Sequence, residues 1–149
     1  MKFTGKTATA IIPFPLDKIL LVKRRTSPFK GYWALPGGRV NPGETIAQTI
    51  IREVKEETGL DVKIDSKIGE YHEKGIQDGL KYDYYPTCFI VKTLTREITK
   101  QESEIEEIKI FSLAQLPALL AFEHAQMIND FMIRRKWGQQ TANDINDSC

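Results

Sequence analysis

Cysteine is scarce in this chain, which has two cysteines among 149 residues. Cys88 lies inside an apolar run and Cys149 at the C-terminal end, so their spacing gives neither a disulfide framework nor a zinc site. We expect Cys88 to be buried and Cys149 to face solvent. A chain without a disulfide framework suits a reducing cytoplasm.

Long apolar runs are also missing. Residues 1–6 lack the apolar stretch of a signal peptide. No run approaches the roughly 20 apolar residues that are needed to span a bilayer. We therefore expect a soluble, cytoplasmic protein that does not have a membrane as its partner.

Neither charge sign is in excess, because 21 Lys and Arg residues against 20 Asp and Glu residues leave a net charge of +1. This balance gives no electrostatic case for nucleic acid as the main partner. The sequence also contains no internal repeat and no linker. We predict a single domain over residues 1–138, followed by a polar tail over residues 139–149.

What the chain does contain is a succession of strand-like and helix-like segments. Apolar and β-branched runs predict strands over residues 7–12, 18–24, 33–35, 60–71, 82–94 and 105–112. Glycine, proline and charge predict turns or loops over residues 36–38, 75–79 and 96–104. Helical spacing predicts helices over residues 46–58 and 123–137 and a short helix from Leu113. The order of these elements predicts a mixed α/β domain of the α+β type.

The first predicted helix has the clearest pattern. Ile46, Ile50 and Val54 recur at i, i+4 and i+8. Ala47 and Ile51 would widen this apolar stripe, and a glycine follows as the expected C-terminal stop.

The same helix carries a cluster of carboxylates. Glu53, Glu56 and Glu57 stand at i, i+3 and i+4 and therefore fall within one face. Like charges at this spacing destabilise a bare helix by a few tenths of a kcal/mol per pair, roughly. The face is either simply solvated or a hard oxygen-ligand set for Mg²⁺, with Mn²⁺ as the alternative.

The residues before the helix favour the metal site. Gly38 has no side chain, so its carbonyl can approach the same ion. From Gly38 there are five residues to Glu44 and seven more to Arg52, which opens the run Arg-Glu-Val-Lys-Glu-Glu-Thr-Gly-Leu. This pattern resembles the Nudix box at every fixed position. The resemblance implies the Nudix fold, a mixed β-sheet sandwiched between helices, and hydrolysis of a diphosphate linkage in a nucleotide-like substrate.

The resemblance also implies roles for the box residues. Glu53 and Glu57 are expected to be the main metal ligands, and Glu56 a further ligand or the general base. Arg52 is expected to orient a carboxylate through a salt bridge to Glu44 or Glu56.

The general base stays open at this point. In some Nudix enzymes a box glutamate does this work, and in others a residue from the loop before the last strand does it. Here that loop offers Glu102 and Glu104 as candidates, and the simpler alternative is that both belong to a solvated acidic loop.

Several residues are candidates for binding the rest of the substrate. Arginine can hold phosphate oxygens by bidentate hydrogen bonds, and Arg24, Arg25 and Arg39 lie near the box loop in sequence. Since strand neighbours point to opposite faces, only one of Arg24 and Arg25 is expected to face the site. Tyr32 and Trp33 are candidates for stacking on a base, or for ordinary core packing.

The start of the last predicted helix adds one more candidate. Its sequence Ala-Phe-Glu-His resembles a segment of some Nudix nucleotide pyrophosphatases, with Glu123 where aspartate is found there. Glu123 is therefore a candidate for base recognition, or it simply charges the start of the helix.

The resemblance implies a hydrolase of ADP-ribose-like compounds or nucleoside triphosphates, and a homodimer is compatible with it. A dinucleoside polyphosphate or cap hydrolase is one alternative. A non-catalytic ligand-sensing or scaffold module is another, but such modules usually lose box glutamates, and this chain has all of them.

Overall fold

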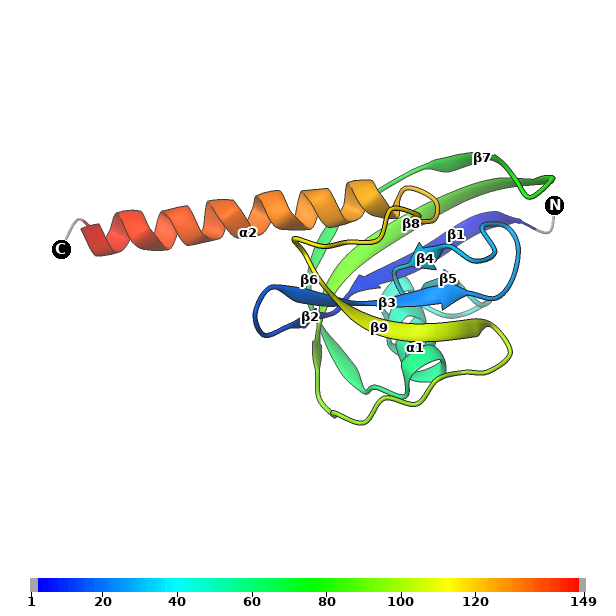
Figure 1. Cartoon of the computed structure of the whole chain (residues 1–149), viewed down its shortest axis with the longest axis horizontal. Coiled ribbons are helices and arrows are strands. Elements are labelled where there is room, and N and C mark those ends of the chain that lie inside the picture. The colour runs from blue at the N-terminus through cyan, green and yellow to red at the C-terminus, as the bar shows by residue number, and fades with distance from the viewer. Residues whose placement is uncertain (1–2, 148–149) are drawn as a thin grey trace.

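The computed structural model describes residues 3–147, and the side chains of residues 3–136 within them. Figure 1 shows strands packed around helix α1, with helix α2 projecting from one end of the body. The strands are β1 (Thr4–Ile11), β2 (Pro13–Phe14), β3 (Lys18–Arg24), β4 (Trp33–Ala34), β5 (Gly37–Arg39), β6 (Val62–Glu70), β7 (Glu73–Gln77), β8 (Leu80–Thr93) and β9 (Ile105–Ser112). The helices are α1 (Ile46–Thr58) and α2 (His124–Asp147).

The strands form two sheets. In the five-stranded sheet, β1 pairs with β8 in parallel and with β5 antiparallel, while β8 also holds β6 and β7 antiparallel. In the four-stranded sheet, β3 pairs antiparallel with β2, β4 and β9. The predicted mixed α+β architecture is confirmed.

Two apolar clusters fill the layers. The larger one joins α1 to both sheets through side chains such as Ile50, Val54 and Leu20. The smaller one joins the start of α2 to the sheets through Met127 and Phe131. Burial of these stripes fixes α1 against one region of the sheets and α2 against another, so the sheets are sandwiched between the two helices.

Local signals set the bounds of α1. Thr45 caps its N-terminus in a reciprocal capping box with Gln48, and Gly59 ends it in the left-handed conformation (φ 78°). The predicted helix is therefore confirmed at both ends.

The prediction that Ile51 widens the apolar stripe of this helix is wrong. Ile51 is 40% exposed, because the narrow face through Ile50 and Val54 suffices to cover the sheets.

Three other sequence predictions need correction. The turn predicted over residues 36–38 is mostly strand β5, since Gly37 and Gly38 pair with β1. The turn predicted over residues 75–79 is shorter, because β7 extends to Gln77 and forms a hairpin with β8. The short helix predicted from Leu113 is a turn followed by irregular chain.

The C-terminal helix extends beyond its predicted end at residue 137, to Asp147, so most of the predicted tail has helical backbone. Cys88 is buried as predicted, whereas Cys149 lies outside the described residues. Neither helix within residues 3–147 is long and apolar enough to cross a membrane.

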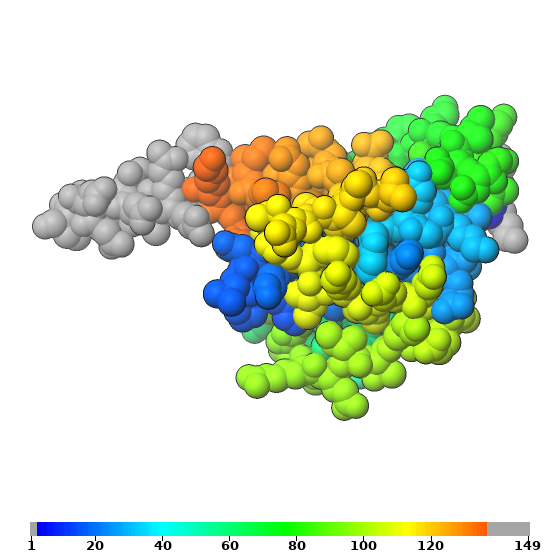
Figure 2. Space-filling model, viewed as in Figure 1, coloured from blue at the N-terminus to red at the C-terminus, as the bar shows by residue number. Residues whose placement is uncertain are grey.

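In the space-filling view, β9 and the chain after it (yellow) lie between α2 (orange) and the loop from residue 94 (yellow-green) (Figure 2).

Candidate functional site

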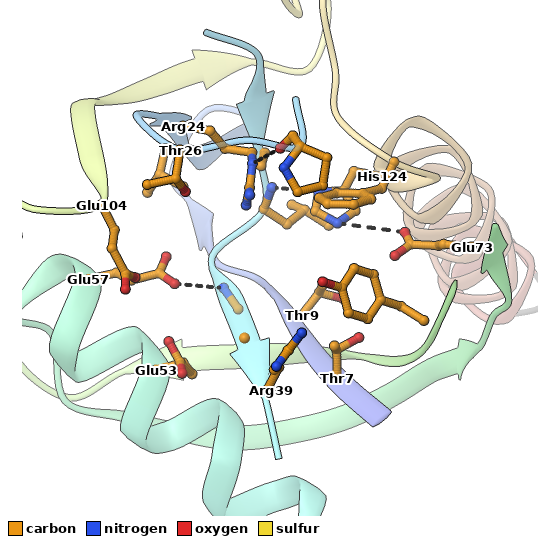
Figure 3. A pocket seen from close by; sticks show the side chains of 18 of the residues that line it. Thr7, Thr9, Arg24, Thr26, Arg39, Glu53, Glu57, Glu73, Glu104 and His124 are labelled. Carbon is orange, nitrogen blue, oxygen red and sulfur yellow. Dashed lines mark hydrogen bonds and ion pairs between the residues drawn. The ribbon is translucent and has the colours of Figure 1, made fainter. Parts of the chain in front are cut away.

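A cavity of about 390 Å³ opens between α1, the two sheets and the start of α2. Figure 3 shows Glu53, Glu57 and Glu104 on one side of it, and Glu73 and His124 on the other. The cavity therefore has a wall built from the predicted box helix and a second wall that the sequence analysis did not anticipate.

On the α1 wall, two glutamates lie together. Glu57 is only 4% exposed, and its Oε1 accepts a hydrogen bond from the backbone N–H of Gly37 at 3.4 Å. Burial and the neighbouring Glu53 carboxylate raise the pKa of Glu57 well above its ordinary value. Burial likewise raises the pKa of Glu53. The two carboxylates lie close enough to disfavour each other's charge, and a bound cation would relieve this repulsion.

Glycine is required where β5 passes this wall. A Cβ on Gly38 would overlap the carboxylate of Glu53, so any larger residue would displace that side chain. A Cβ on Gly37 would instead overlap the backbone oxygen of Ala8 in the adjoining strand β1. The two glycines allow close approach to a side chain and to a strand, respectively.

Arg52 organises the carboxylates around it. Its Nε donates to Glu44 Oε2 at 2.7 Å, and its Nη1 donates to Glu53 Oε1 at 2.9 Å and to Glu56 Oε2 at 3.1 Å. The bonds from Arg52, Thr49 and the Asn41 N–H lower the pKa of Glu44 to about 2. The geometry agrees with both salt bridges considered for Arg52. Arg52 therefore restrains the side chain of Glu53, which lies at the cavity wall.

Glu56 does not join the other two glutamates. Its side chain is 48% exposed and pairs with Arg52, and neither it nor Glu44 lines the cavity. Of the three glutamates predicted to share one helix face, Glu53 and Glu57 line the cavity, whereas Glu56 does not.

The residues present fit a divalent cation. Glu53 and Glu57 supply hard carboxylate oxygens on the cavity wall, which Mg²⁺ and Mn²⁺ prefer, and Gly38 brings backbone to the same place. Within the described side chains, no three His, Cys, Asp or Glu residues are already arranged closely enough to enclose an ion. The protein thus offers two carboxylates, and water and substrate oxygens would complete the coordination.

Two of the three predicted arginines reach the cavity. Arg24 donates from Nε to the carbonyl of Pro28 at 2.8 Å and lies 5.2 Å from the ring centre of Phe122. Burial lowers its pKa despite nearby carboxylates. Arg39 lies 5.9 Å from the ring centre of Tyr84. Arg25 follows the end of β3, is exposed and does not line the cavity, in agreement with the opposite-face prediction.

The loop before β9 contributes one glutamate rather than two. Glu104 lines the cavity, whereas Glu102 is exposed and pairs with Lys100 at 3.5 Å. The nearby charge of Glu104 is one of the influences that raise the pKa of Glu57. Of the two candidate bases in this loop, only Glu104 is placed at the site.

The remaining candidates lie elsewhere. Tyr32 packs edge-on against Phe29, and Trp33 packs edge-on against Phe111. Neither aromatic lines the cavity, so the core-packing alternative holds for both. The side chain of Glu123 is exposed and also lies outside the cavity lining.

The second wall was missed by the sequence analysis. It carries Glu73 from β7 and His124 from the first turn of α2. No fixed spacing connects these positions, and no strand was predicted at β7, whose last three residues were expected to lie in a turn. The available signals were a glutamate beside a tyrosine-rich strand and a histidine at a predicted helix start.

Comparison with known protein families identifies the domain: the NUDIX domain family model matches residues 5–131. The chain belongs to the Nudix family. The Nudix fold predicted from the box is thereby confirmed, and the box glutamates Glu53 and Glu57 lie on the cavity wall of a Nudix domain.

Curated relatives carry names from the same family. The chain is 40% identical over 116 residues to an ADP-ribose pyrophosphatase of Methanocaldococcus jannaschii, covering 78% of this chain and 66% of the relative. It is 34% identical over 127 residues to a putative 8-oxo-dGTP diphosphatase of Bacillus subtilis, covering 85% and 76%. The chain thus spans slightly less than two thirds of the archaeal relative's length.

Solved Nudix structures share the fold. A MutT Nudix hydrolase from Burkholderia pseudomallei has a TM-score of 0.76 at 23% identity, over 85% of this chain and 97% of that one. The Nudix domain of NrtR from Shewanella oneidensis, solved with ADP ribose, has a TM-score of 0.70 at 25% identity, over 90% of each chain.

Proposed function

We propose that this Nudix protein is a divalent-metal-dependent hydrolase that cleaves a diphosphate linkage in a nucleoside diphosphate derivative. The observation that carries the proposal is the pair Glu53 and Glu57 on the wall of a cavity of about 390 Å³, where Glu57 is buried and the Glu53 side chain is 13% exposed. Arg24 and Arg39 line the same cavity. It therefore offers oxygen ligands for cations beside guanidinium groups for phosphate oxygens.

The residues divide the chemistry between them. A bound Mg²⁺, or Mn²⁺ in its place, would neutralise phosphate oxygens and lower the pKa of the attacking water. Glu53 and Glu57 would hold this ion, and Arg52 fixes Glu53 in its orientation. Arg24 and Arg39 would bind the non-bridging phosphate oxygens. Water adds to one phosphorus as the bridging oxygen leaves it, which yields a nucleotide and a second phosphorylated product.

Glu104 is our proposed general base, because it reaches the cavity and Glu102 does not. Replacing Glu104 by Gln is expected to lower kcat by roughly a hundredfold, the usual effect of losing a positioned base. The matched variant Glu102→Gln is expected to leave kcat unchanged. Steady-state kinetics of both variants checks this, and equal effects of the two changes would refute the assignment.

The relatives suggest the substrate class. The names ADP-ribose pyrophosphatase and 8-oxo-dGTP diphosphatase belong to proteins similar to this one, and we propose ADP-ribose-like compounds or nucleoside triphosphates for this chain. We also propose that residues 1–138 act as one domain on a small nucleotide, in the cytoplasm, without nucleic acid or membrane as a partner. A homodimer is compatible with these proposals.

The test is a panel of ADP-ribose, nucleoside triphosphates and dinucleoside polyphosphates, assayed with Mg²⁺, with Mn²⁺ and with EDTA. We expect release of a nucleoside monophosphate with either metal and none with EDTA. Undiminished turnover in chelator would overturn the metal dependence. Tight binding of a nucleotide without turnover of any substrate would instead favour a ligand-sensing module.

A further inference from the structure

The wall of the cavity opposite the box helix carries a buried carboxylate of its own. Glu73 is 3% exposed, yet it lines the cavity. Its Oε2 accepts a hydrogen bond from the backbone N–H of Glu123 at 3.0 Å. Among the described residues, no hydrogen bond reaches its Oε1. Because Oε1 is also not among the buried polar atoms that lack a partner, it is open to the cavity and can accept a donor from a molecule bound there.

The neighbouring histidine does not neutralise this carboxylate. The Nδ1 atom of His124 accepts a hydrogen bond from the backbone N–H of Leu35 at 3.0 Å, so the proton of the neutral ring sits on Nε2. That Nε2 lies 3.8 Å from Glu73 Oε2, too far for a direct hydrogen bond. Burial lowers the pKa of His124 to about 3, which keeps the ring uncharged. The ring presents an N–H to Glu73 without a positive charge.

Aromatic rings frame the same end of the cavity. Phe122 and Tyr84 line it, and their ring centres lie 5.9 Å apart in an edge-to-face arrangement. Phe29 and Tyr82 pack against Phe122 from behind, at 4.6 and 5.3 Å. Their contacts hold Phe122 in place, and a rigid aromatic surface of this kind stacks on a planar heterocycle.

We propose that Glu73 is a specificity-determining residue that reads the nucleobase, accepting two adjacent N–H donors such as N1–H and the 2-amino group of guanine. This inference rests on the proposed function, since the box end would hold the diphosphate and leave the base for the opposite wall. A carboxylate accepts two parallel N–H bonds in one plane, and such charge-assisted pairs are strong when water is excluded. Adenine offers a donor beside an acceptor on the corresponding edge and matches an ionised carboxylate less well.

The geometry assigns this role to Glu73 rather than to Glu123. The Glu123 side chain is exposed and outside the cavity lining, and its contribution is the backbone N–H that orients Glu73. Glu123, the candidate for base recognition from the sequence, is thus a hydrogen-bond partner of Glu73, the residue that we propose contacts the base.

The direct test is equilibrium binding of GMP, IMP and AMP by calorimetry, in the presence of Mg²⁺, to the full-length protein. IMP lacks only the 2-amino group of GMP. We expect GMP to bind about tenfold more tightly than IMP or AMP, the usual discrimination of a bidentate pair. In Glu73→Gln, which keeps one acceptor and adds a donor, the preference for GMP is expected to disappear.

Two further variants separate recognition from general damage. Glu123→Gln tests the rival carboxylate, and Glu70→Gln changes an exposed residue of β6 whose side chain is 71% exposed. Both are expected to keep the preference for GMP. Glu73→Asp keeps the charge but withdraws it by one methylene, and it is expected to weaken GMP binding, so the test stands even if Glu73→Gln folds poorly.

The pH dependence gives an independent readout. Burial raises the pKa of Glu73 to about 7. Facing it are Arg24 from β3, Tyr82 from β8, and Glu123 and His124 at the start of α2. Because two donors require the ionised form, the ratio of GMP to IMP affinity is expected to rise between about pH 6 and 8, and to become flat in Glu73→Gln.

The outcomes of these tests are distinct. Equal binding of the three nucleotides to the unaltered protein, or an unchanged preference in Glu73→Gln, would overturn the base-reading role while leaving hydrolysis intact. Absence of turnover with every substrate, combined with the expected preference for GMP, would overturn the proposed hydrolase function but not the role of Glu73.

Discussion

Replacing Glu57 by Gln is expected to reduce kcat by roughly a hundredfold or more, because even indirect partners of a metal site contribute about 10–100-fold and this residue is proposed to touch the ion. Its side chain is buried beside Glu53, with the Gly37 N–H as a hydrogen-bond donor. The amide keeps the size of the side chain but removes the charge that would attract the cation. Turnover of the best substrate from the nucleotide panel measures the effect.

Thermal unfolding separates this loss from misfolding. Added Mg²⁺ is expected to raise the Tm of the unaltered protein, because a ligand that binds only the folded state stabilises it. The Glu57→Gln variant is expected to lose this shift while its Tm in EDTA is not lowered, since one of two neighbouring carboxylates that disfavour each other's charge is gone. Glu107→Gln, an exposed change on β9, serves as the control. A Glu57→Gln variant with full activity and a full Mg²⁺ shift would show that Glu57 is not a ligand.

The second large effect is expected at the paired glycines of β5. In Gly38→Ala the new Cβ meets the Glu53 carboxylate, which lies at the end of a flexible side chain and can move away. We expect about a 10–100-fold loss of activity or metal affinity with a nearly unchanged Tm. In Gly37→Ala the Cβ meets the backbone oxygen of Ala8, which is held in the β1–β5 ladder. That variant is expected to lose about 1–3 kcal/mol of unfolding free energy, as overpacked positions do.

Urea unfolding and Mg²⁺ titration of the two glycine variants check these expectations. The two variants are expected to differ in what they lose. Gly38→Ala is expected to lose activity or metal affinity, and Gly37→Ala is expected to lose stability. A Gly38→Ala variant that binds Mg²⁺ like the unaltered protein would argue against Glu53 as a ligand. Equal losses of stability in both variants would show that the Glu53 side chain cannot relax.

The box helix was predictable because its information is local. The capping threonine, the i, i+4 apolar spacing and the terminal glycine all lie within one short segment, and each acts on its own neighbours. The strands β3 and β9 were predicted for the same reason, since their β-branched and apolar runs are contiguous. By contrast, β5 was expected to be a turn, because two successive glycines carry no strand propensity and are explained only by what packs against them.

Local spacing could not predict which glutamates of the acidic cluster line the cavity and which one is exposed. Helical spacing places Glu53, Glu56 and Glu57 on one face, but it cannot say how far the neighbouring strand covers that face. Contact with β5 buries Glu57, and Arg52 draws Glu56 to the rim. The same limit applies to Arg24 and Arg25, where alternation predicted one inward residue but not which of the two.

The sequence by itself determined the family and the acidic helix, because these depend on residue types at fixed short spacings. Only the tertiary structure decided which residues face one another across the cavity. His124 accepts a hydrogen bond from the backbone of Leu35, 89 positions away, and beside it lies Glu73, from a strand that the sequence did not predict. Such pairs are made by the folding of sheets and helices around one core, and no periodicity along the chain records them.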